Sequence, residues 1–221
     1  MASTTRTYES DGVAVHYDAR RCIHAAECVR GLPHVFDPAR KPWIDPTQAA
    51  ADAIVEVVQR CPTGALHFTR KDGGGAEPTP MANTVEVVPD GPLYVRGDLQ
   101  VETPDGEVVL RDTRVALCRC GLSKRKPFCD GSHEPGALEA GFADAGALGT
   151  HNATMPEGAG PLRIVLAKDG PLQLRGPVEV RGAEGAAVVT AKGSLCRCGQ
   201  SANKPFCDGT HKRIGFTTGD R

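Results

Sequence analysis

The chain lacks several features that would place it in common classes of protein. Its 221 residues contain no apolar run near the roughly 18 residues that a membrane span needs. The N-terminal stretch MASTTRTYES has no apolar segment of the kind found in secretory signal peptides. Aromatic residues make up only 5% of the chain, against 26 glycines and 17 prolines. We therefore expect a soluble protein without membrane attachment, built from small domains whose limited cores need additional cross-links.

Neither sign of charge dominates the sequence. Lys and Arg number 26 against 27 Asp and Glu, which gives a formal net charge of -1 at pH 7. The chain therefore has no large positive field of the kind that binds nucleic acids or anionic membranes. It also contains no GxGxxG turn, no P-loop and no assignable Ser/His/Asp set. We expect no nucleic-acid or membrane partner, and we place a non-enzymatic role ahead of an enzymatic one.

The nine cysteines are the most informative residues of the chain. An odd number of cysteines cannot complete a disulfide framework, and close spacings without a secretory segment favour metal binding in a reducing compartment. We therefore expect a cytoplasmic metalloprotein. The cysteines fall into three groups: Cys22, Cys28 and Cys61; Cys118, Cys120 and Cys129; and Cys196, Cys198 and Cys207.

An internal repeat organises the chain after the Gly/Pro-rich stretch at residues 71–80. DGPLYVRG at 90–97 returns as DGPLQLRG at 169–176, and CRCGLSKRKPFCDGSH at 118–133 returns as CRCGQSANKPFCDGTH at 196–211. We expect an N-terminal domain at residues 1–72, a linker at 73–82, a first repeat domain at 83–140, a linker at 141–160 and a second repeat domain at 161–221.

Hydrophobic patterning predicts an α+β protein. Alternating apolar residues at 13–17 predict a strand, residues 65–68 a second strand, and the apolar face of residues 50–58 a helix that starts after Asp45-Pro46. The N-terminal domain is therefore expected to be a small α+β domain. Alternating runs bounded by Asp-Gly and Gly-Pro turns predict that both repeats are mostly β; they lie at residues 84–88, 93–95 and 162–166.

Each repeat carries three cysteines and a histidine at metal-ligand spacing. Cys118 and Cys120 are two residues apart, so on an extended loop they point to one side and can hold one iron. Cys129 and His133 are four residues apart and can hold a second iron from one helical face, with Asp130 as the helix cap. These ligand types also make an ordinary zinc set, so they leave the metal open. The second set comprises Cys196, Cys198, Cys207 and His211.

The complete string C-R-C-G-x-S-x-x-K-P-F-C-D-G-[ST]-H resembles the mitoNEET-like CDGSH iron-sulfur family, and it occurs twice. The resemblance covers residues 83–140 and 161–221 and implies one 2Fe-2S cluster in each repeat. It also implies that the two repeats form a pseudo-dimer within one chain, so we expect a monomer. The implied ligands are Cys118, Cys120, Cys129 and His133 in one repeat, and Cys196, Cys198, Cys207 and His211 in the other.

The N-terminal cysteines resemble a different iron-sulfur pattern. CIHAAEC at 22–28, followed by Cys61-Pro62, is similar to a ferredoxin cluster-binding sequence in which Ala25 occupies the place of the middle cysteine. Residues 8–70 resemble the divergent mono-cluster 4Fe-4S family, whose pattern has a histidine at the place of His24. The resemblance implies either a 3Fe-4S cluster on Cys22, Cys28 and Cys61, or a 4Fe-4S cluster with His24 as the fourth ligand.

These sites predict an electron carrier that works between a reductase and an acceptor protein. The single histidine ligand of each repeat would couple electron uptake to proton uptake. A cluster-transfer or redox-sensing protein is the second interpretation, and an enzyme that binds substrate at an open iron of the N-terminal cluster is the third. Arg125, Lys126 and Lys204 could steer an acidic partner, although we expect them to be solvated surface residues.

Overall fold

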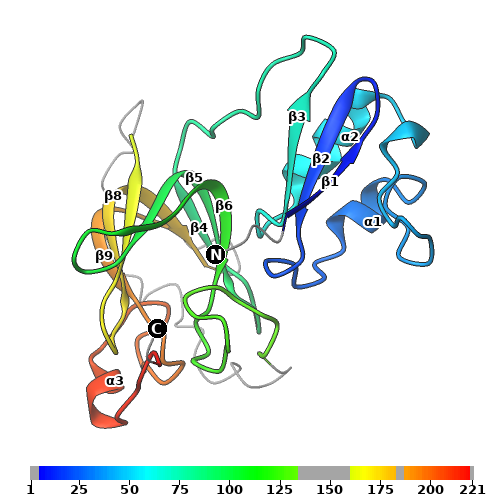
Figure 1. Ribbon diagram of the computed structural model, residues 1–221. Helices are drawn as coiled ribbons and strands as arrows, with labels where there is room; N and C mark the ends of the chain where they lie inside the picture. Colours follow the sequence, from blue (N-terminus) through cyan, green and yellow to red (C-terminus); the bar gives the residue numbers. More distant parts are fainter. Residues whose placement is uncertain (1–4, 134–159, 183–186, 220–221) are drawn as a thin grey trace. The chain divides into compact units, whose positions relative to one another are not determined.

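The computed structural model describes residues 5–133, 160–182 and 187–219 (Figure 1). The chain divides into two compact units, one ending at Pro78 and the other beginning at Thr79. The linker predicted at 141–160 lies outside the described residues, apart from its last residue. No helix among the described ranges has the length and apolar character to cross a membrane.

The first unit is a three-stranded antiparallel sheet with short helices in one long connection (Figure 1). The strands β1 (Thr5–Glu9), β2 (Val13–Asp18) and β3 (Leu66–Arg70) lie side by side in chain order. The connection from β2 to β3 contains α1 (Glu27–Gly31), the 3-10 turn η1 (Pro46–Gln48) and α2 (Ala51–Arg60). This unit is α+β, as the patterning predicts.

Helix α2 closes the core of the first unit. Ile54, Val57 and Val58 recur on one face of the helix and are buried. They share one apolar cluster with Val15 and Phe68 of the sheet. Complete burial of a side chain of this size stabilises the fold by about 1.5–3 kcal/mol.

The start of this helix differs from the prediction. Asp45 and Pro46 begin η1, where the amide of Thr47 donates a hydrogen bond of 3.1 Å to Asp45 Oδ1. Ala49 then has extended backbone (φ -153°, ψ 163°), so α2 begins only at Ala51. The prediction of a helix starting at Asp45-Pro46 is wrong because this capping pair serves a separate turn.

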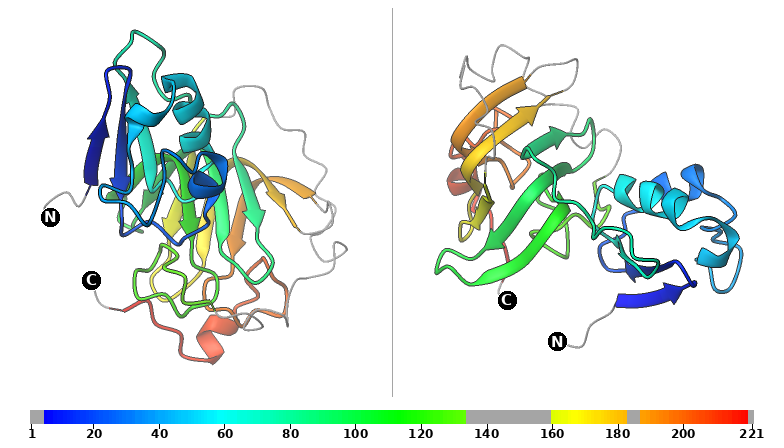
Figure 2. Two further views of the ribbon diagram at one scale, coloured as in Figure 1. Left: turned by 90° about the vertical axis from the view of Figure 1, so that its right-hand side faces the viewer. Right: turned by 90° about the horizontal axis from the view of Figure 1, so that it is seen from above.

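The second unit is a six-stranded sheet in which the two repeats supply matching strands. In each repeat a short strand precedes a long antiparallel hairpin, and Figure 2 shows the two hairpins in green and in yellow to orange. The short helix α3 (Thr210–Arg213) follows the last strand, so the described part of this unit is mostly β, as predicted. The strands are β4 (Thr84–Val87), β5 (Leu93–Glu102) and β6 (Val108–Leu117), then β7 (Leu162–Leu166), β8 (Leu172–Arg181) and β9 (Ala187–Leu195).

The short strand of each repeat pairs with both repeats. β4 is antiparallel to β5 and parallel to β8, with Thr84 opposite Glu179. β7 is antiparallel to β8 and parallel to β5, with Leu162 opposite Leu99. The apolar cluster inside these strands therefore combines both repeats; its members include Val85, Val95, Val101, Ile164, Leu174 and Val180.

Asn83 joins the two repeats just before β4. Its buried side chain donates hydrogen bonds of 3.0 Å to the carbonyl oxygens of Gly160 and Pro177, and accepts one of 3.1 Å from the amide of Asp98. Gly97 has φ 144°, and a Cβ there would lie 2.1 Å from Asn83 Oδ1. The irregularity in β5 at this glycine therefore makes room for the asparagine.

An ion pair crosses the same junction. The side chain of Glu102 on β5 is 2% exposed and accepts hydrogen bonds from Arg163 Nη2 at 2.7 Å and Nε at 3.1 Å on β7. Gln100 Nε2 donates a third bond at 2.9 Å. The hydrogen bonds from Arg163 hold the pKa of the Glu102 carboxyl below its ordinary value, against the opposing effect of burial.

Candidate metal centres

Each repeat places its cysteines on the loop that follows its last strand. The amide of Cys118 donates to Pro127 O at 2.8 Å and that of Cys129 to Ala116 O at 2.9 Å, so the loop folds back on the end of β6. Figure 1 and Figure 2 show both loops at the same end of the strands of this unit. The corresponding bonds of the second repeat join Cys196 to Pro205 at 2.7 Å and Cys207 to Ser194 at 2.8 Å.

The four predicted ligands of each repeat lie in two pairs. The Sγ atoms of Cys118 and Cys120 are 3.7 Å apart, and Cys129 Sγ is 3.4 Å from His133 Nδ1. The matching distances in the second repeat are 3.8 Å and 3.3 Å. Within the described ranges, no group of three or more Cys, His, Asp and Glu side chains could hold one metal ion. Each close pair supplies two ligands to one metal atom, which is the arrangement that a two-iron cluster uses.

A turn, and not a helix, forms the second pair in the first repeat. Asp130 Oδ1 accepts hydrogen bonds from the amide of Ser132 at 3.1 Å and from its hydroxyl at 2.6 Å. This turn brings His133 next to Cys129 without helical backbone. The prediction of a helix capped by Asp130 is therefore wrong there. In the second repeat, only His211 of the pair lies in a helix, α3.

Backbone amides approach the sulfur atoms of both pairs. Leu122 N donates to Cys120 Sγ at 3.5 Å, and Gly131 N donates to Cys129 Sγ at 3.4 Å. Such bonds favour the charged form of the thiol and tune a bound cluster. The second repeat has the same bond from Gly209 N to Cys207 Sγ at 3.4 Å.

A hydrogen bond joins the thiols of Cys118 and Cys120. The hydrogen bond from Cys120 lowers the pKa of Cys118 to about 6, and it raises the pKa of Cys120 itself. Burial raises the pKa of Cys129 to about 11. Iron binding requires thiolates, so it must displace protons from Cys120 and Cys129.

A buried arginine between the two cysteines anchors each loop. Arg119 Nε donates to Gly91 O at 2.7 Å and its Nη2 to Val88 O at 2.6 Å. These carbonyls flank the turn that opens the DGPL segment, so the bonds explain why DGPL and CRC recur together. Sequence reasoning missed this role, although the arginine is identical in both repeats. Arg197 makes the same bonds to Gly170 O at 2.9 Å and Ala167 O at 2.5 Å.

The two ligand loops are in backbone contact with each other. A Cβ on Gly121 would lie 2.8 Å from the carbonyl oxygen of Cys198, and a Cβ on Gly199 would lie 2.6 Å from that of Cys120. Both glycines also have left-handed backbone, with φ values of 80° and 79°. Only glycine accepts both the left-handed backbone and the lack of room for a Cβ. Because the two loops contact each other in this way, the two candidate centres are neighbours.

One lysine differs from the prediction. Lys204 is only 5% exposed, and its Nζ donates to Ser201 O at 2.7 Å. The expectation of a solvated surface residue is wrong for Lys204, because its ammonium holds the loop together. Lys126 Nζ makes the same bond to Ser123 O at 2.8 Å. Arg125 is exposed, as predicted.

The three N-terminal cysteines gather around α1 and the end of α2. Cys22 precedes α1, Cys28 lies within it, and Cys61 follows the last residue of α2. Burial, followed by the charges of Cys61 and Cys22, raises the pKa of Cys28 to about 11. The three thiols therefore interact, yet no three ligand side chains of the described residues meet at one ion. Neighbouring cysteine thiols are the ligands that iron-sulfur clusters use.

Tyr17 is a residue of this site that the sequence reasoning treated only as part of a strand. Burial, the charge of Cys22 and a hydrogen bond with Cys22 raise the pKa of the Tyr17 phenol. Its ring packs edge-on against Trp43, with centroids 4.9 Å apart. The predicted ligand His24 is exposed and has left-handed backbone, φ 58°, as does Ala26 with φ 64°. These strained positions shape the loop between the first two cysteines.

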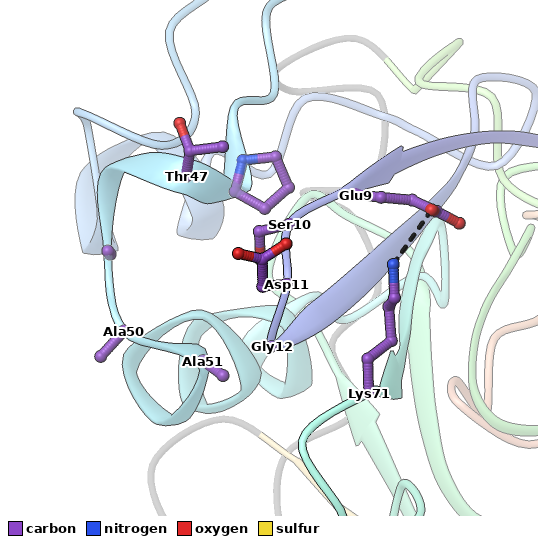
Figure 3. A pocket seen from close by; sticks show the side chains of 10 residues that line it. Glu9, Ser10, Asp11, Gly12, Thr47, Ala50, Ala51 and Lys71 are labelled. Atoms are coloured by element: carbon purple, nitrogen blue, oxygen red, sulfur yellow. Dashed lines mark hydrogen bonds and ion pairs between the residues drawn. The ribbon is translucent and has the colours of Figure 1, made fainter.

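A pocket of the first unit lies at the turn between β1 and β2 (Figure 3). Glu9 and Lys71 line one side, where Lys71 Nζ is 3.2 Å from Glu9 Oε2, and Thr47 and Ala51 lie on the other side. No cysteine or histidine is among its lining residues. This pocket is therefore separate from the predicted cluster site.

Comparison with known proteins finds two families and a pair of relatives. The model of the family described as divergent 4Fe-4S mono-cluster matches residues 8–71, and that of the iron-binding zinc finger of CDGSH type matches residues 90–134 and 169–212. The uncharacterized protein YjdI of Escherichia coli (strain K12) is 36% identical over 66 residues, which span 87% of YjdI and 30% of this chain. YjdI of Escherichia coli O157:H7 matches equally. No solved structure matches the chain.

Proposed function

Because the chain belongs to the divergent 4Fe-4S mono-cluster family and to the CDGSH iron-binding family, we propose that this iron-sulfur protein is an electron carrier. The arrangement of the ligands of each repeat in two close pairs is the observation that supports the proposal most directly. Bound iron-sulfur clusters supply one-electron redox chemistry. A reductase and an acceptor protein, in the cytoplasm, would be its partners. The odd number and close spacing of the nine cysteines support a reducing compartment.

We assign a 2Fe-2S cluster to each repeat and a 3Fe-4S or 4Fe-4S cluster to the first unit. In the first unit the ligands are Cys22, Cys28 and Cys61, with His24 as the fourth ligand if the cluster has four irons. In the repeats the ligands are Cys118, Cys120, Cys129 and His133, and Cys196, Cys198, Cys207 and His211.

Iron and acid-labile sulfide analysis of anaerobically purified protein tests this assignment. We expect about seven irons per chain with a 3Fe-4S cluster and about eight with a 4Fe-4S cluster. One zinc per repeat in place of iron would contradict the assignment. EPR spectra before and after His24→Ala test the fourth ligand, because an unchanged spectrum excludes ligation by His24.

We also propose that the two repeats form an intrachain pseudo-dimer and that the protein is a monomer. The reciprocal pairing of β4 with β8 and of β7 with β5 supports this proposal, because each repeat completes the sheet of the other. Sedimentation at several protein concentrations tests it, and a concentration-dependent dimer would contradict it.

Proton coupling at His133 and His211 is a further part of the proposed function. An imidazole ligand keeps a ring nitrogen that can take up a proton when charge is added nearby. Where one proton accompanies each electron, the potential falls by about 59 mV per pH unit. Protein-film voltammetry of wild type, His133→Cys and His211→Cys tests this, since flat wild-type potentials would contradict it.

Cluster donation is the second candidate function. His133 and His211 are partly exposed, whereas Cys118 and Cys196 are buried, so each site has an accessible ligand that a protonation event could release. Mixing the holo-protein with an apo-ferredoxin separates the two functions. A carrier keeps its iron, whereas a donor transfers it to the apo-ferredoxin.

A further inference from the structure

The two ligand loops of the second unit, residues 118–133 and 196–211, have the same internal bonding. Ser123 Oγ donates to Phe128 O at 2.7 Å in the first loop, and Ser201 Oγ donates to Phe206 O at 2.6 Å in the second. An aspartate accepts a backbone amide in both: Lys124 N donates to Asp130 Oδ2 at 2.8 Å, and Ala202 N to Asp208 Oδ2 at 2.9 Å. Because the two loops share these hydrogen bonds, the side chains at equivalent positions can be compared directly.

The exposed positions of the two loops carry different chemistry. Leu122, Lys124 and Arg125 of the first loop are exposed, and Leu122 is 56% exposed. Because the second loop folds with neutral polar or small side chains at the same places, the loop conformation does not require a leucine and two cations. The corresponding residues of the second loop are Gln200, Ala202 and Asn203, all exposed.

The segment that carries these three residues directly follows the more accessible C-x-C pair. The amide of Leu122 bonds to Cys120 Sγ at 3.5 Å, so the exposed leucine is adjacent to a predicted iron ligand. Cys120 is partly exposed, whereas its counterpart Cys198 is 7% exposed and buried. Close approach to a redox centre is therefore easier at the first loop than at the second.

Another exposed basic and apolar group lies at the second site. Lys212, Arg213 and Ile214 are exposed at the end of α3. Arg213 Nη2 donates to Thr210 Oγ1 at 2.5 Å within that helix. Cations at the end of a helix also interact favourably with its carbonyl groups. Arg213 thus has a local structural role, and the three residues together provide a control with an equal loss of positive charge.

We propose that Leu122, Lys124 and Arg125, the first-loop patch, form the docking surface for an acidic one-electron carrier protein. The proposal rests on the proposed electron-transfer function and names its partner class. The two cations steer an acidic surface toward the site, and the single leucine adds a small apolar contact suited to a short-lived redox encounter. One electron then passes between the docked proteins, so that one is oxidised and the other reduced without any bond being made or broken.

Binding of a dye-labelled acidic plant-type ferredoxin to the holo-protein, followed by fluorescence anisotropy, tests the proposal. The variant L122Q/K124A/R125N gives the first loop the residues of the second, so its iron content should remain that of wild type. We expect it to bind about tenfold more weakly than wild type at about 0.05 M salt, and the difference should vanish near about 0.5 M salt. The control K212A/R213N/I214Q also removes two positive charges, but at the second site. It should bind within about twofold of wild type.

Carbodiimide cross-linking gives a second readout. A ferredoxin carboxylate docked on the patch should form an amide with Lys124 Nζ, which peptide mass spectrometry locates. Absence of salt-dependent binding by wild type, equal binding by the first-loop variant, or equal losses in both variants would overturn the proposal. Tighter wild-type binding to duplex DNA or to anionic vesicles would also overturn it. If pre-reduced ferredoxin docks at the patch but transfers no electron, the docking surface stands and the proposed electron-transfer function fails.

Discussion

Gly121 and Gly199 each approach the backbone of the opposite ligand loop, so neither position has room for a side chain. We expect Gly121→Ala to lower the free energy of unfolding by about 2–5 kcal/mol, the sum of left-handed backbone strain and forced overlap. Because the overlap is with the carbonyl oxygen of Cys198, the substitution should also reduce the iron bound by the second repeat. Urea unfolding and EPR of both CDGSH centres measure the two effects.

Gly106→Ala is the matched control for that substitution. Gly106 lies in the turn between β5 and β6 with φ 86°, and a Cβ there would have nothing within 4 Å. It should show only the backbone strain, about 1–2 kcal/mol, with normal iron content. Equal effects of the two substitutions would contradict close contact between the loops.

Glu102 should make stability depend on pH. Its folded-state pKa is lowered by Arg163, so its stabilising contribution is complete above the unfolded value, about 4.3, and is lost as pH falls through the folded value. Glu102→Gln should therefore lower the free energy of unfolding by about 1–3 kcal/mol at neutral pH, with a smaller difference below about pH 4. Urea unfolding of wild type and of Glu102→Gln at each pH measures this difference. Any loss of iron in acid affects both proteins equally. A difference that stays constant through acid pH would contradict the prediction.

At the residue scale, the sequence predicted the candidate ligands better than the residues that hold the ligand loops in place. The spacing of Cys118 and Cys120 predicts their proximity, because alternate residues of an extended loop share a side. The role of Arg119 depends on carbonyls that are distant in sequence. Tyr17 and Lys204 bond to residues nearby in sequence, but only the folded conformation of the loop brings those groups together. Periodicity and ligand spacing contain no information on such contacts.

Between elements, Asn83 bonds to segments from both repeats and should be sensitive to a change of one atom. Asn83→Asp replaces the amide donor with a carboxylate oxygen facing the carbonyls of Gly160 and Pro177. We expect a loss of about 1–3 kcal/mol per buried partner left unsatisfied, measured by thermal unfolding.

Asn203→Asp provides a control for the asparagine prediction. Asn203 is exposed on the second ligand loop, so the same chemical change should alter the unfolding free energy by about 0.5 kcal/mol or less. A similar loss in both variants would show that charge alone, and not the buried bonds of Asn83, determines the effect.

Strands were easier to predict than helix ends. Residues 13–17, 84–87 and 162–166 form strands, within the predicted runs. In β4 the buried Val85 and Val87 alternate with less buried residues, as one buried face requires. The helix start at Asp45-Pro46 was wrong because a cap and a proline are equally suited to a 3-10 turn. The i, i+4 spacing of Cys129 and His133 likewise fits a turn closed by an aspartate.

Over the whole molecule, the two units should respond differently to removal of iron. The main apolar cluster of the second unit contains no cysteine, whereas that of the first unit includes Cys61 and contacts Cys22 and Cys28. Anaerobic chelation should therefore expose the amides of residues 118–133 and 196–211 and loosen α2, while β5 and β8 stay protected. Hydrogen exchange with mass spectrometry measures this, and simultaneous loss of protection in β5 and β8 would contradict it.

The repeat itself was visible in the sequence, but the strand pairing between repeats was not. Alternation of apolar residues shows which face of a strand is buried. It does not identify the strands that pair with its two edges. The parallel pairs of β4 with β8 and β5 with β7 join residues that no local pattern connects. Only the three-dimensional arrangement reveals them.

The pairing of β4 with β8 sets the order in which the chain can fold during synthesis. The described strands of the first unit lie within residues 5–70, so this unit can fold while the ribosome is still adding the rest. β4 ends at Val87, but its parallel partner begins only at Leu172. Non-local parallel pairs form late in folding. The nascent first repeat therefore has unpaired strand edges until β8 has been synthesised. During this interval the unpaired edges of the first repeat are open to edge-to-edge aggregation.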